Sequence, residues 1–204
     1  MIICWNAFLI FKNICQPVNG TGKITTWTLF RYKGDFHIKK ITCAETYAIH
    51  ESYVFPRDLN NGQIQFGGRT LEILDANAGI AGVKFAPSNL SFVTAGYDHV
   101  QFLSPLKQNE IVKCTSYVTG ANRRAIEVFT KFEKQDKLTR EITPAFIAFC
   151  SLIVTNPLNE IDFPELVAET TEEKYLVATY SERLKKRQAE LQVNKSILAH
   201  LEKH

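Results

Sequence analysis

The chain has 204 residues, of which 45% are hydrophobic and 22% charged, a composition typical of a globular protein. It excludes an intrinsically disordered, collagen-like or disulfide-scaffold protein, and a chain of this length can bury a core without a metal or disulfide. The formal net charge of +3 is too small for a general nucleic-acid-binding surface, although a small phosphate-bearing ligand needs only a local basic patch.

The cysteines and histidines give no sign of a structural disulfide or a metal site. The five cysteines are widely spaced without a Cys-x-x-Cys pair, and the five histidines are equally scattered. No apolar run approaches the ~18–20 residues that span a bilayer. The apolar start, residues 1–11, has no basic segment before it and no small-residue cleavage site after it. We therefore expect a cytoplasmic protein with no cofactor, no membrane partner and no nucleic-acid partner.

The first segment, residues 1–38, differs from the rest of the chain. It contains both tryptophans and no acidic residue before Asp35, and its glycines and Pro17 interrupt any long periodic element. We interpret it as an extension without regular structure, or as a reading frame that begins too far upstream. The pattern of a compact domain follows over residues 39–164.

The domain opens with a strand-like run at 41–55 and a turn-rich segment at 56–63, followed by a helical pattern at 68–85. Runs rich in β-branched and aromatic residues then predict four strands, at 92–103, 111–119, 125–132 and 142–154. The last run is almost entirely apolar, as expected of a central strand covered on both faces. One helix followed by consecutive strands predicts an α+β fold with an antiparallel sheet.

The predicted helix is unusually rich in small residues, among them Gly79 and Gly82. A glycine in a helix interior costs about 1 kcal/mol relative to alanine, so we expect close packing against the sheet to compensate for it. A sheet that wraps around this helix requires such a thin profile.

The third segment, residues 165–204, is predicted to be a basic helical tail. Thr170 and Glu173 have the spacing of a capping box, which marks a helix start. Leucines recur every seven residues from Leu184, but polar residues interrupt the second apolar position of each heptad, so an extended coiled coil is not expected. The basic cluster at 183–187 fits either a solvated helix face or an anion-binding patch.

Two features between residues 60 and 75 can carry chemistry. Asp75 lies in a stretch of apolar and small residues, where a carboxylate must be exposed, hydrogen-bonded or functional. Gly67 and Gly68 precede the helix without a conventional capping side chain, so the first N–H groups of the helix are available to an anion or an oxyanion. A solvent-facing helix position and a simple turn are the alternatives.

Taken together, these residues resemble the signature of hotdog-fold acyl-CoA thioesterases of the cytosolic acyl-CoA hydrolase family, bacterial type. The spacing from Asn60 to the Phe-Gly-Gly triplet and from there to Asp75 agrees with that signature. The resemblance covers residues 39–190 approximately and leaves the first segment unmatched. It continues through Val93–Asp98, Phe102–Pro105, Ile126–Val128 and the basic residues of the tail.

The resemblance implies an antiparallel sheet wrapped around a central helix. It also implies that two such domains pair edge to edge as a dimer, and that three dimers assemble into a hexamer. It implies hydrolysis of fatty acyl-CoA to CoA and a carboxylic acid, with Asp75 as general base or nucleophile. Asn60 of the opposite protomer would orient water or the thioester, and the Gly68 N–H would stabilise the oxyanion. The residues implied for binding substrate and CoA are Gly67, Arg123, Arg124, Arg183 and Lys185.

The chain departs from the family pattern at 122–125, where Asn-Arg-Arg-Ala replaces Gly-Arg-Thr-Ser. Two hydroxyls are lost there, although two arginines suit phosphate. Two alternatives remain: a hotdog hydratase, which needs a histidine near the central helix, and a non-catalytic acyl-CoA-binding regulator. No histidine lies between His50 and His99, and the first segment lacks helix-turn-helix periodicity.

Overall fold

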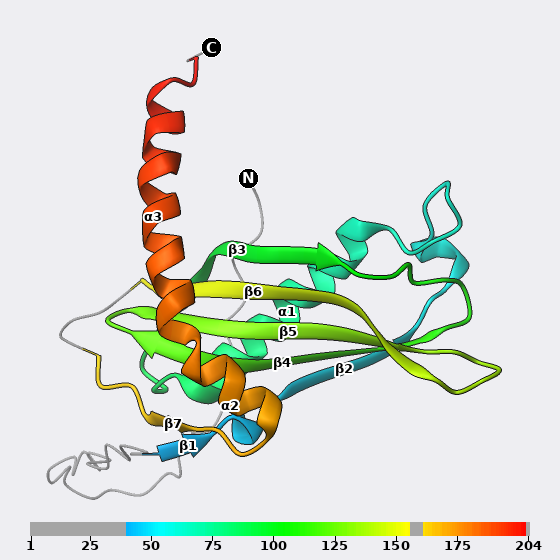
Figure 1. Ribbon diagram of the computed structural model, residues 1–204, viewed down its shortest axis with the longest axis horizontal. Coiled ribbons are helices and arrows are strands. Elements are labelled where there is room, and N and C mark those ends of the chain that lie inside the picture. The colour runs from blue at the N-terminus through cyan, green and yellow to red at the C-terminus, as the bar shows by residue number, and fades with distance from the viewer. Residues whose placement is uncertain (1–39, 156–160, 203–204) are drawn as a thin grey trace, which may run out of the picture. The chain divides into compact units, whose positions relative to one another are not determined.

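The computed structural model describes residues 40–155 and 161–202, so the predicted extension at 1–38 lies outside the described residues. Five antiparallel strands form one sheet in the order β2-β4-β5-β6-β3, and the long helix α1 packs against it (Figure 1). The strands of this sheet are β2 (Ala48–Tyr53), β3 (Phe92–Phe102), β4 (Ile111–Asn122), β5 (Ala125–Gln135) and β6 (Ile142–Val154). The predicted α+β fold with an antiparallel sheet is confirmed.

The remaining elements are short strands and helices outside this sheet. The helices are α1 (Gly67–Phe85), α2 (Thr171–Ala178) and α3 (Tyr180–Ala199), with 3-10 turns at Ala44–Thr46 and Pro56–Asp58. β1 (Lys40–Thr42) and β7 (Glu165–Val167) pair in parallel as a separate two-stranded sheet. The predicted helix and the four later strands are therefore confirmed to within a few residues.

The prediction of one strand over 41–55 is wrong, because the chain turns sharply after Thr42. The Thr42 N–H and hydroxyl both donate to the Glu45 carboxylate, and this closes a 3-10 turn. The hydroxyl of Thr46 then donates to the Cys43 carbonyl and accepts from the Val118 N–H. The segment is therefore divided between two sheets, β1 beside β7 and β2 beside β4.

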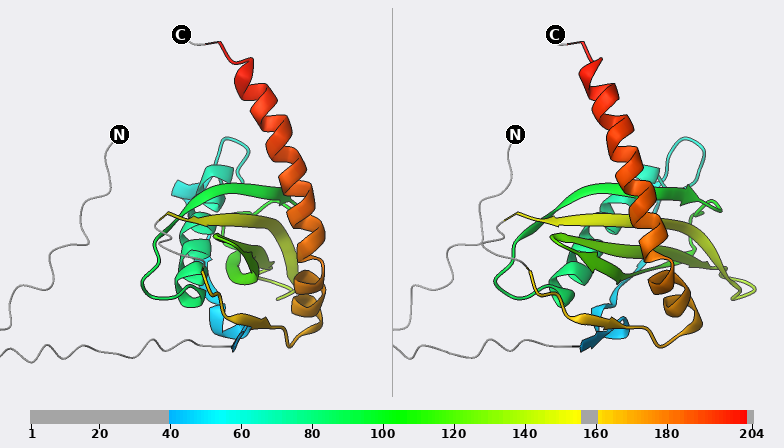
Figure 2. Two further views of the ribbon diagram at one scale, coloured as in Figure 1. Left: turned by 90° about the vertical axis from the view of Figure 1, so that its left-hand side faces the viewer. Right: turned by 60° about the vertical axis from the view of Figure 1, so that its left-hand side comes forward.

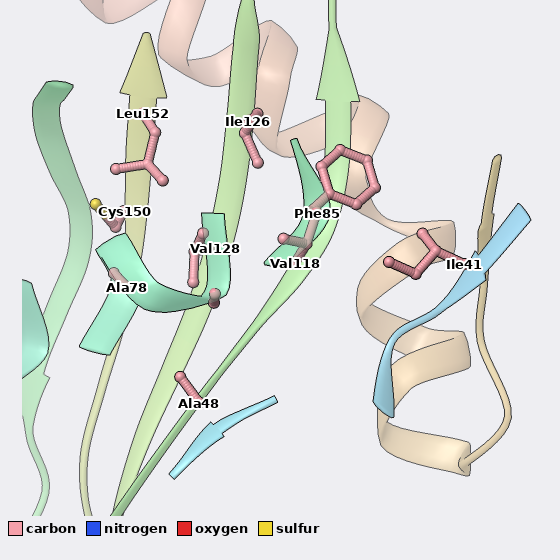
Figure 3. Close-up of a cluster of buried hydrophobic side chains, with 10 residues drawn as sticks. Ile41, Ala48, Ala78, Phe85, Val118, Ile126, Val128, Cys150 and Leu152 are labelled. Carbon is pink, nitrogen blue, oxygen red and sulfur yellow. The ribbon is translucent and has the colours of Figure 1, made fainter. Parts of the chain in front are cut away.

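The main core lies between α1 and the concave face of the sheet (Figure 3). Asn77 of α1 is also buried there, and its amide donates to the Ala48 carbonyl at 2.8 Å and the Ser116 hydroxyl at 3.0 Å. A buried amide with satisfied donors fixes the rotation of the helix on the sheet. The apolar side chains of this cluster include Ala78, Ala81, Phe85, Val118, Ile126, Val128, Cys150 and Leu152.

The two glycines of the α1 interior have different surroundings. A Cβ on Gly82 would lie 2.4 Å from Leu152 and 2.9 Å from Phe92, so close packing explains this glycine as predicted. A Cβ on Gly79 would meet no atom within 4 Å. The packing explanation is therefore wrong for Gly79 within a single chain.

The opposite face of the sheet is covered by the tail. Figure 2 shows the sheet between α1 on one side and α2 with the start of α3 on the other. Tyr117, Phe129 and Phe149 of the sheet pack there with Leu176 of α2. The predicted capping box of α2 is present, because the Thr170 hydroxyl accepts from the Glu173 N–H while the Glu173 carboxylate accepts from the Thr170 N–H. Because of this cover, β6 is buried on both faces, as its composition predicts.

A buried ion-pair network attaches α3 to the sheet. The Glu127 side chain on β5 is fully buried, and both its oxygens are bonded to arginines of α3. Arg183 donates to Oε1 at 2.8 and 3.1 Å, and Arg187 donates to Oε2 at 2.7 Å. Arg187 also pairs with Asp98 of β3, and the Thr119 hydroxyl donates to Glu127 at 2.7 Å. The carboxylate is thus buried with full compensation of its charge.

Candidate active site

Asp75 lies in the middle of α1 with its side chain directed towards β3. The residue is exposed, and its Oδ1 accepts a hydrogen bond from the Thr94 hydroxyl at 2.7 Å and another from the Tyr97 hydroxyl. Burial, together with the hydrogen bond to Asp75, raises the pKa of Tyr97, so this phenol remains a donor at neutral pH. Asp75 therefore has one oxygen held by two hydroxyls, while no side chain of the described residues bonds to Oδ2.

A β-bulge in β3 brings these two hydroxyls together. In a regular strand, residues three positions apart point to opposite faces of the sheet. Here Thr94 pairs with Leu152 and Gly96 pairs with Ser151, so β3 has one residue more than β6 at this point. The extra residue, Ala95, reverses the alternation, and both Thr94 and Tyr97 reach Asp75. Bulges of this kind often re-aim side chains at active sites.

The start of α1 has free backbone donors. Phe66 is the N-cap residue and makes no side-chain capping bond, and the first N–H with a backbone acceptor inside the turn is that of Arg69. Within the described part of the chain, the N–H groups of Gly67 and Gly68 donate no hydrogen bond. Such a terminus, at the positive end of the helix dipole, favours an anion or a developing oxyanion.

Asn60 is held in a tight turn just before this helix. Its Oδ1 accepts from the Gly62 N–H at 2.8 Å, and its backbone N–H donates to the Ile64 carbonyl at 2.8 Å. Gln63 in the same turn has a positive φ of 58°. Because Oδ1 is occupied, the side-chain amide group Nδ2 is the part of Asn60 that remains available to a ligand among the described contacts.

Asn60 and Gly67 line one cavity of about 380 Å³. Its walls are mainly apolar and include Phe102 and Phe146, whose rings pack edge to face with centroids 5.0 Å apart. A cavity with apolar walls and a few polar groups at one end suits a ligand with an apolar portion beside a polar centre. Asp75 does not line it.

Asp75 is too far along the helix to act beside Gly67 of the same chain. Eight residues separate them, which corresponds to about 12 Å at a rise of 1.5 Å per residue. The structure thus brings Asn60 together with Gly67, and Asp75 together with Thr94 and Tyr97, but it does not bring the two groups together in one protomer.

The residues predicted to bind CoA lie in different environments. Arg123 and Arg124 are exposed at the hairpin between β4 and β5, where Arg123 has a positive φ of 52°. Lys185 is exposed on α3. Arg183 is mostly buried, and its guanidinium bonds to Glu127 and lies 4.3 Å from the ring centroid of Phe149. The role of all four in binding CoA stays a prediction.

Neither a metal site nor a cysteine nucleophile is found in the described part of the chain. Residues 40–155 and 161–202 contain no group of three or more metal-ligating side chains, and no helix among them is long and apolar enough to span a membrane. Burial raises the pKa of the Cys114 and Cys150 thiols to about 12. His99 and Asp98 do not form an acid–base pair, since the Asp98 carboxylate binds Arg187 and the His99 ring packs against Phe149.

The family of this chain is shown by its similarity to a known protein. The sequence is 33% identical over 146 residues to the uncharacterized acyl-CoA thioester hydrolase YkhA of Bacillus subtilis, a match that covers 71% of this chain and 84% of that protein. This chain belongs to the acyl-CoA thioester hydrolase family. No family model matches the sequence. The resemblance found in the sequence is thereby confirmed, and the enzyme class is that of a thioester hydrolase.

Solved structures of acyl-CoA hydrolases share the fold of this hydrolase. The Bacillus cereus enzyme superimposes with a TM-score of 0.73 at 28% identity, covering 80% of this chain and 99% of its own. A hexameric acyl-CoA thioesterase gives 0.68 at 26% identity over 76% and 98% of the two chains. The Staphylococcus aureus enzyme, solved with butyryl-CoA, CoA and CoA disulfide, gives 0.72 at 24% identity over 79% and 98%. The hotdog fold is confirmed.

Thr94 and Tyr97 are not among the site residues that the sequence predicts. Both lie within the Val93–Asp98 motif, but strand periodicity alone places them on opposite faces. Gly96, a residue that is frequent at bulges, is the signal in the sequence that could have revealed the change of face.

Proposed function

We propose that this chain hydrolyses the thioester of fatty acyl-CoA, with Asp75 as the reacting carboxylate and Asn60 and Gly68 of the opposite protomer as its partners. The observation that carries the proposal is the exposed Asp75 carboxylate, held through Oδ1 by Thr94 and Tyr97 with Oδ2 left to react. Membership of the acyl-CoA thioester hydrolase family supports the choice of reaction.

In the general-base route, Asp75 takes a proton from water while the water oxygen bonds to the thioester carbonyl carbon. The Gly68 N–H donates to the resulting oxyanion, with the amide Nδ2 of Asn60 as a second donor. The tetrahedral intermediate then collapses, the C–S bond breaks, and the proton passes from Asp75 to the departing sulfur. The products are free CoA and a carboxylic acid.

In the nucleophilic route, the Asp75 carboxylate attacks the thioester carbonyl carbon and expels CoA as the thiolate. Water then attacks the aspartyl carbonyl of the mixed anhydride, releases the carboxylic acid and leaves one water oxygen in Asp75, while its proton passes to the thiolate. A single turnover in ¹⁸O-water distinguishes the routes. Incorporation of ¹⁸O into Asp75 indicates the covalent route, whereas the general-base route places ¹⁸O in the carboxylic acid product and none in the enzyme. Mass spectrometry of the peptide that contains Asp75 measures the outcome.

The geometry of a single chain supports a site shared between protomers. Asp75 is about 12 Å along α1 from Gly67, too far for both to act on one carbonyl within a chain. β3 is an edge strand with exposed apolar side chains, among them Val93 and Phe102, and such an edge is suited to pairing with a second copy. A hexameric relative supports a homo-oligomer, for which we propose a trimer of dimers.

Substrate binding is proposed to divide between an apolar and a basic region. The cavity beside Asn60 and Gly67 would take the apolar portion of the substrate. The exposed Arg123, Arg124 and Lys185 would bind the phosphates of CoA. The S. aureus relative, which was solved with butyryl-CoA and CoA, supports CoA as part of the ligand.

Structures of that relative also include alanine variants of an asparagine and of an aspartate 15 positions later, the same separation as Asn60 and Asp75. The equal spacing supports the roles proposed for Asn60 and Asp75.

The activity is tested by following thiol release from acyl-CoAs of increasing chain length. Asp75→Asn is expected to lower kcat by about 10²–10⁴-fold, the scale of losing a general base. Glu72→Gln is the matched control, because Glu72 is an exposed carboxylate on the same helix and pairs with Arg69. Equal activity in wild type and Asp75→Asn would reject Asp75 as the reacting group. CoA binding without hydrolysis by wild type would favour the non-catalytic regulator.

The shared site is tested by mixing two inactive variants, Asn60→Ala and Asp75→Asn, under conditions that exchange subunits. A mixed dimer has one site with both residues replaced and one site with both intact. Random exchange of equal amounts should therefore restore about a quarter of wild-type activity, because half of the dimers are mixed. No recovery despite verified exchange would place both residues in the same protomer's site.

A further inference from the structure

Tyr97 supplies a second hydroxyl donor to Asp75. Hydrolysis by a carboxylate does not in itself require this donor, and neither does the position of Tyr97 in the strand. Its hydroxyl donates to Oδ1 of Asp75, the same oxygen that accepts from Thr94. The ring is partly buried and packs against the core cluster of Ala78 and Cys150 and against a second buried cluster that includes Leu74 and Phe146. The phenol is thus held rigidly by the core on one side and reaches the exposed carboxylate on the other.

We propose that Tyr97 is a positioning residue that fixes the rotation of the Asp75 carboxylate, so that Oδ2 is the oxygen that reacts. The proposal rests on the function proposed above. A carboxylate on a single χ2 torsion rotates readily, and its two oxygens are equivalent unless donors distinguish them. The hydroxyls of Thr94 and Tyr97 both donate to Oδ1, and this distinguishes it from Oδ2.

The bulge at Ala95 is what makes this arrangement possible. Without the extra residue, Thr94 and Tyr97 would face opposite sides of β3, and one of them would be lost to Asp75. The bulge in the edge strand β3 therefore places a second hydroxyl at the Asp75 carboxylate. If the Tyr97 hydroxyl were needed only for packing, it would not require this bulge.

The other titratable groups near Asp75 are either protonated or paired with another residue. Tyr97 on β3 and the Cys150 thiol on β6 are both kept protonated, chiefly by burial. Asp98 and Arg187, the charged groups on the far side of Cys150, are paired with each other, and Glu72 on α1 is paired with Arg69. Asp75 is therefore the carboxylate to which the Tyr97 hydroxyl donates.

Tyr97→Phe tests the proposal because it removes the hydroxyl and keeps the ring. We expect kcat to fall about tenfold with KM changed less than twofold, on the scale of one hydrogen bond to a charged group. Because the ring and its packing are kept, the loss should appear in kcat and not in KM. Thermal melting checks that the variant is folded.

Tyr47→Phe is the matched control, since the Tyr47 hydroxyl also donates to a carboxylate, that of Glu173, away from the site. It should cost a similar amount of stability but leave kcat unchanged. An unchanged kcat in Tyr97→Phe, or a change in KM alone, would overturn the proposal. Absence of hydrolysis by wild type would instead reject the proposed function.

Discussion

Replacement of Arg183 by alanine separates a structural role from a role in binding CoA. The guanidinium makes two hydrogen bonds to the fully buried Glu127 and donates to the Leu176 carbonyl and the Thr179 hydroxyl, each at 2.6 Å. Removal of one partner from a buried ion pair costs about 3–5 kcal/mol. Arg187 and Thr119 would remain on Glu127, so we expect the lower end of that range.

A loss of about 3 kcal/mol corresponds to a fall in Tm of about 6–12 °C for a chain of this length. Urea unfolding and thermal melting of Arg183→Ala and wild type, at equal protomer concentration, measure it. The KM for acyl-CoA should change little when it is measured well below the melting transition.

Lys185→Ala is the control for this experiment, because Lys185 is two residues away on α3 and exposed. It should change the free energy of unfolding by less than about 0.5 kcal/mol and raise KM, as expected of a surface lysine that binds phosphate. If Arg183→Ala instead unfolded at the same urea concentration as wild type and raised KM tenfold, the guanidinium would face CoA, and the reasoning from the buried network would be refuted.

Three further measurements test the packing of the fold. Gly82→Ala should destabilise the protein by about 1–3 kcal/mol through its clash with Leu152, whereas Gly79→Ala should stabilise an isolated protomer by about 0.5–1 kcal/mol; urea unfolding compares them. Thr170→Ala should cost about 1 kcal/mol by removing the cap of α2, seen as a lower urea midpoint. Cys114 and Cys150, with pKa values raised to about 12, should resist iodoacetamide at pH 8 until the protein unfolds, as peptide mapping would detect.

The elements that the sequence predicts well are those with a single strong period. α1 and β6 were predicted with almost their observed bounds, because one has apolar and small residues at helical spacing and the other is apolar throughout. The strand at 41–55 was mispredicted because its interruption depends on hydrogen bonds of Thr42 with Glu45, which apolar periodicity does not register. Local side-chain bonds of this kind compete with strand pairing.

The role of Arg183 shows a different limit of sequence reasoning. A basic cluster on a helix is equally compatible with a phosphate, a solvated face and a buried partner. The partner here is Glu127, which is 56 residues away in sequence and comes close to Arg183 only when α3 packs across β5. Of these two basic residues in the same cluster, Arg183 is therefore buried and Lys185 is exposed. The resemblance to a family does not distinguish the buried residue from the exposed one.

The carboxylate that we propose as the reacting group shows where a site depends on an irregularity of the backbone. Asp75 could be singled out from its sequence surroundings, but its two donors could not, since period-two alternation places Thr94 and Tyr97 on opposite faces. One unpaired residue in β3 places both on the same face. An edge strand tolerates such a bulge because only β6 has to accommodate the change of register. The position of β3 at the edge of the sheet thus permits both the bulge that orients Asp75 and the pairing with a second protomer that we propose to complete the site.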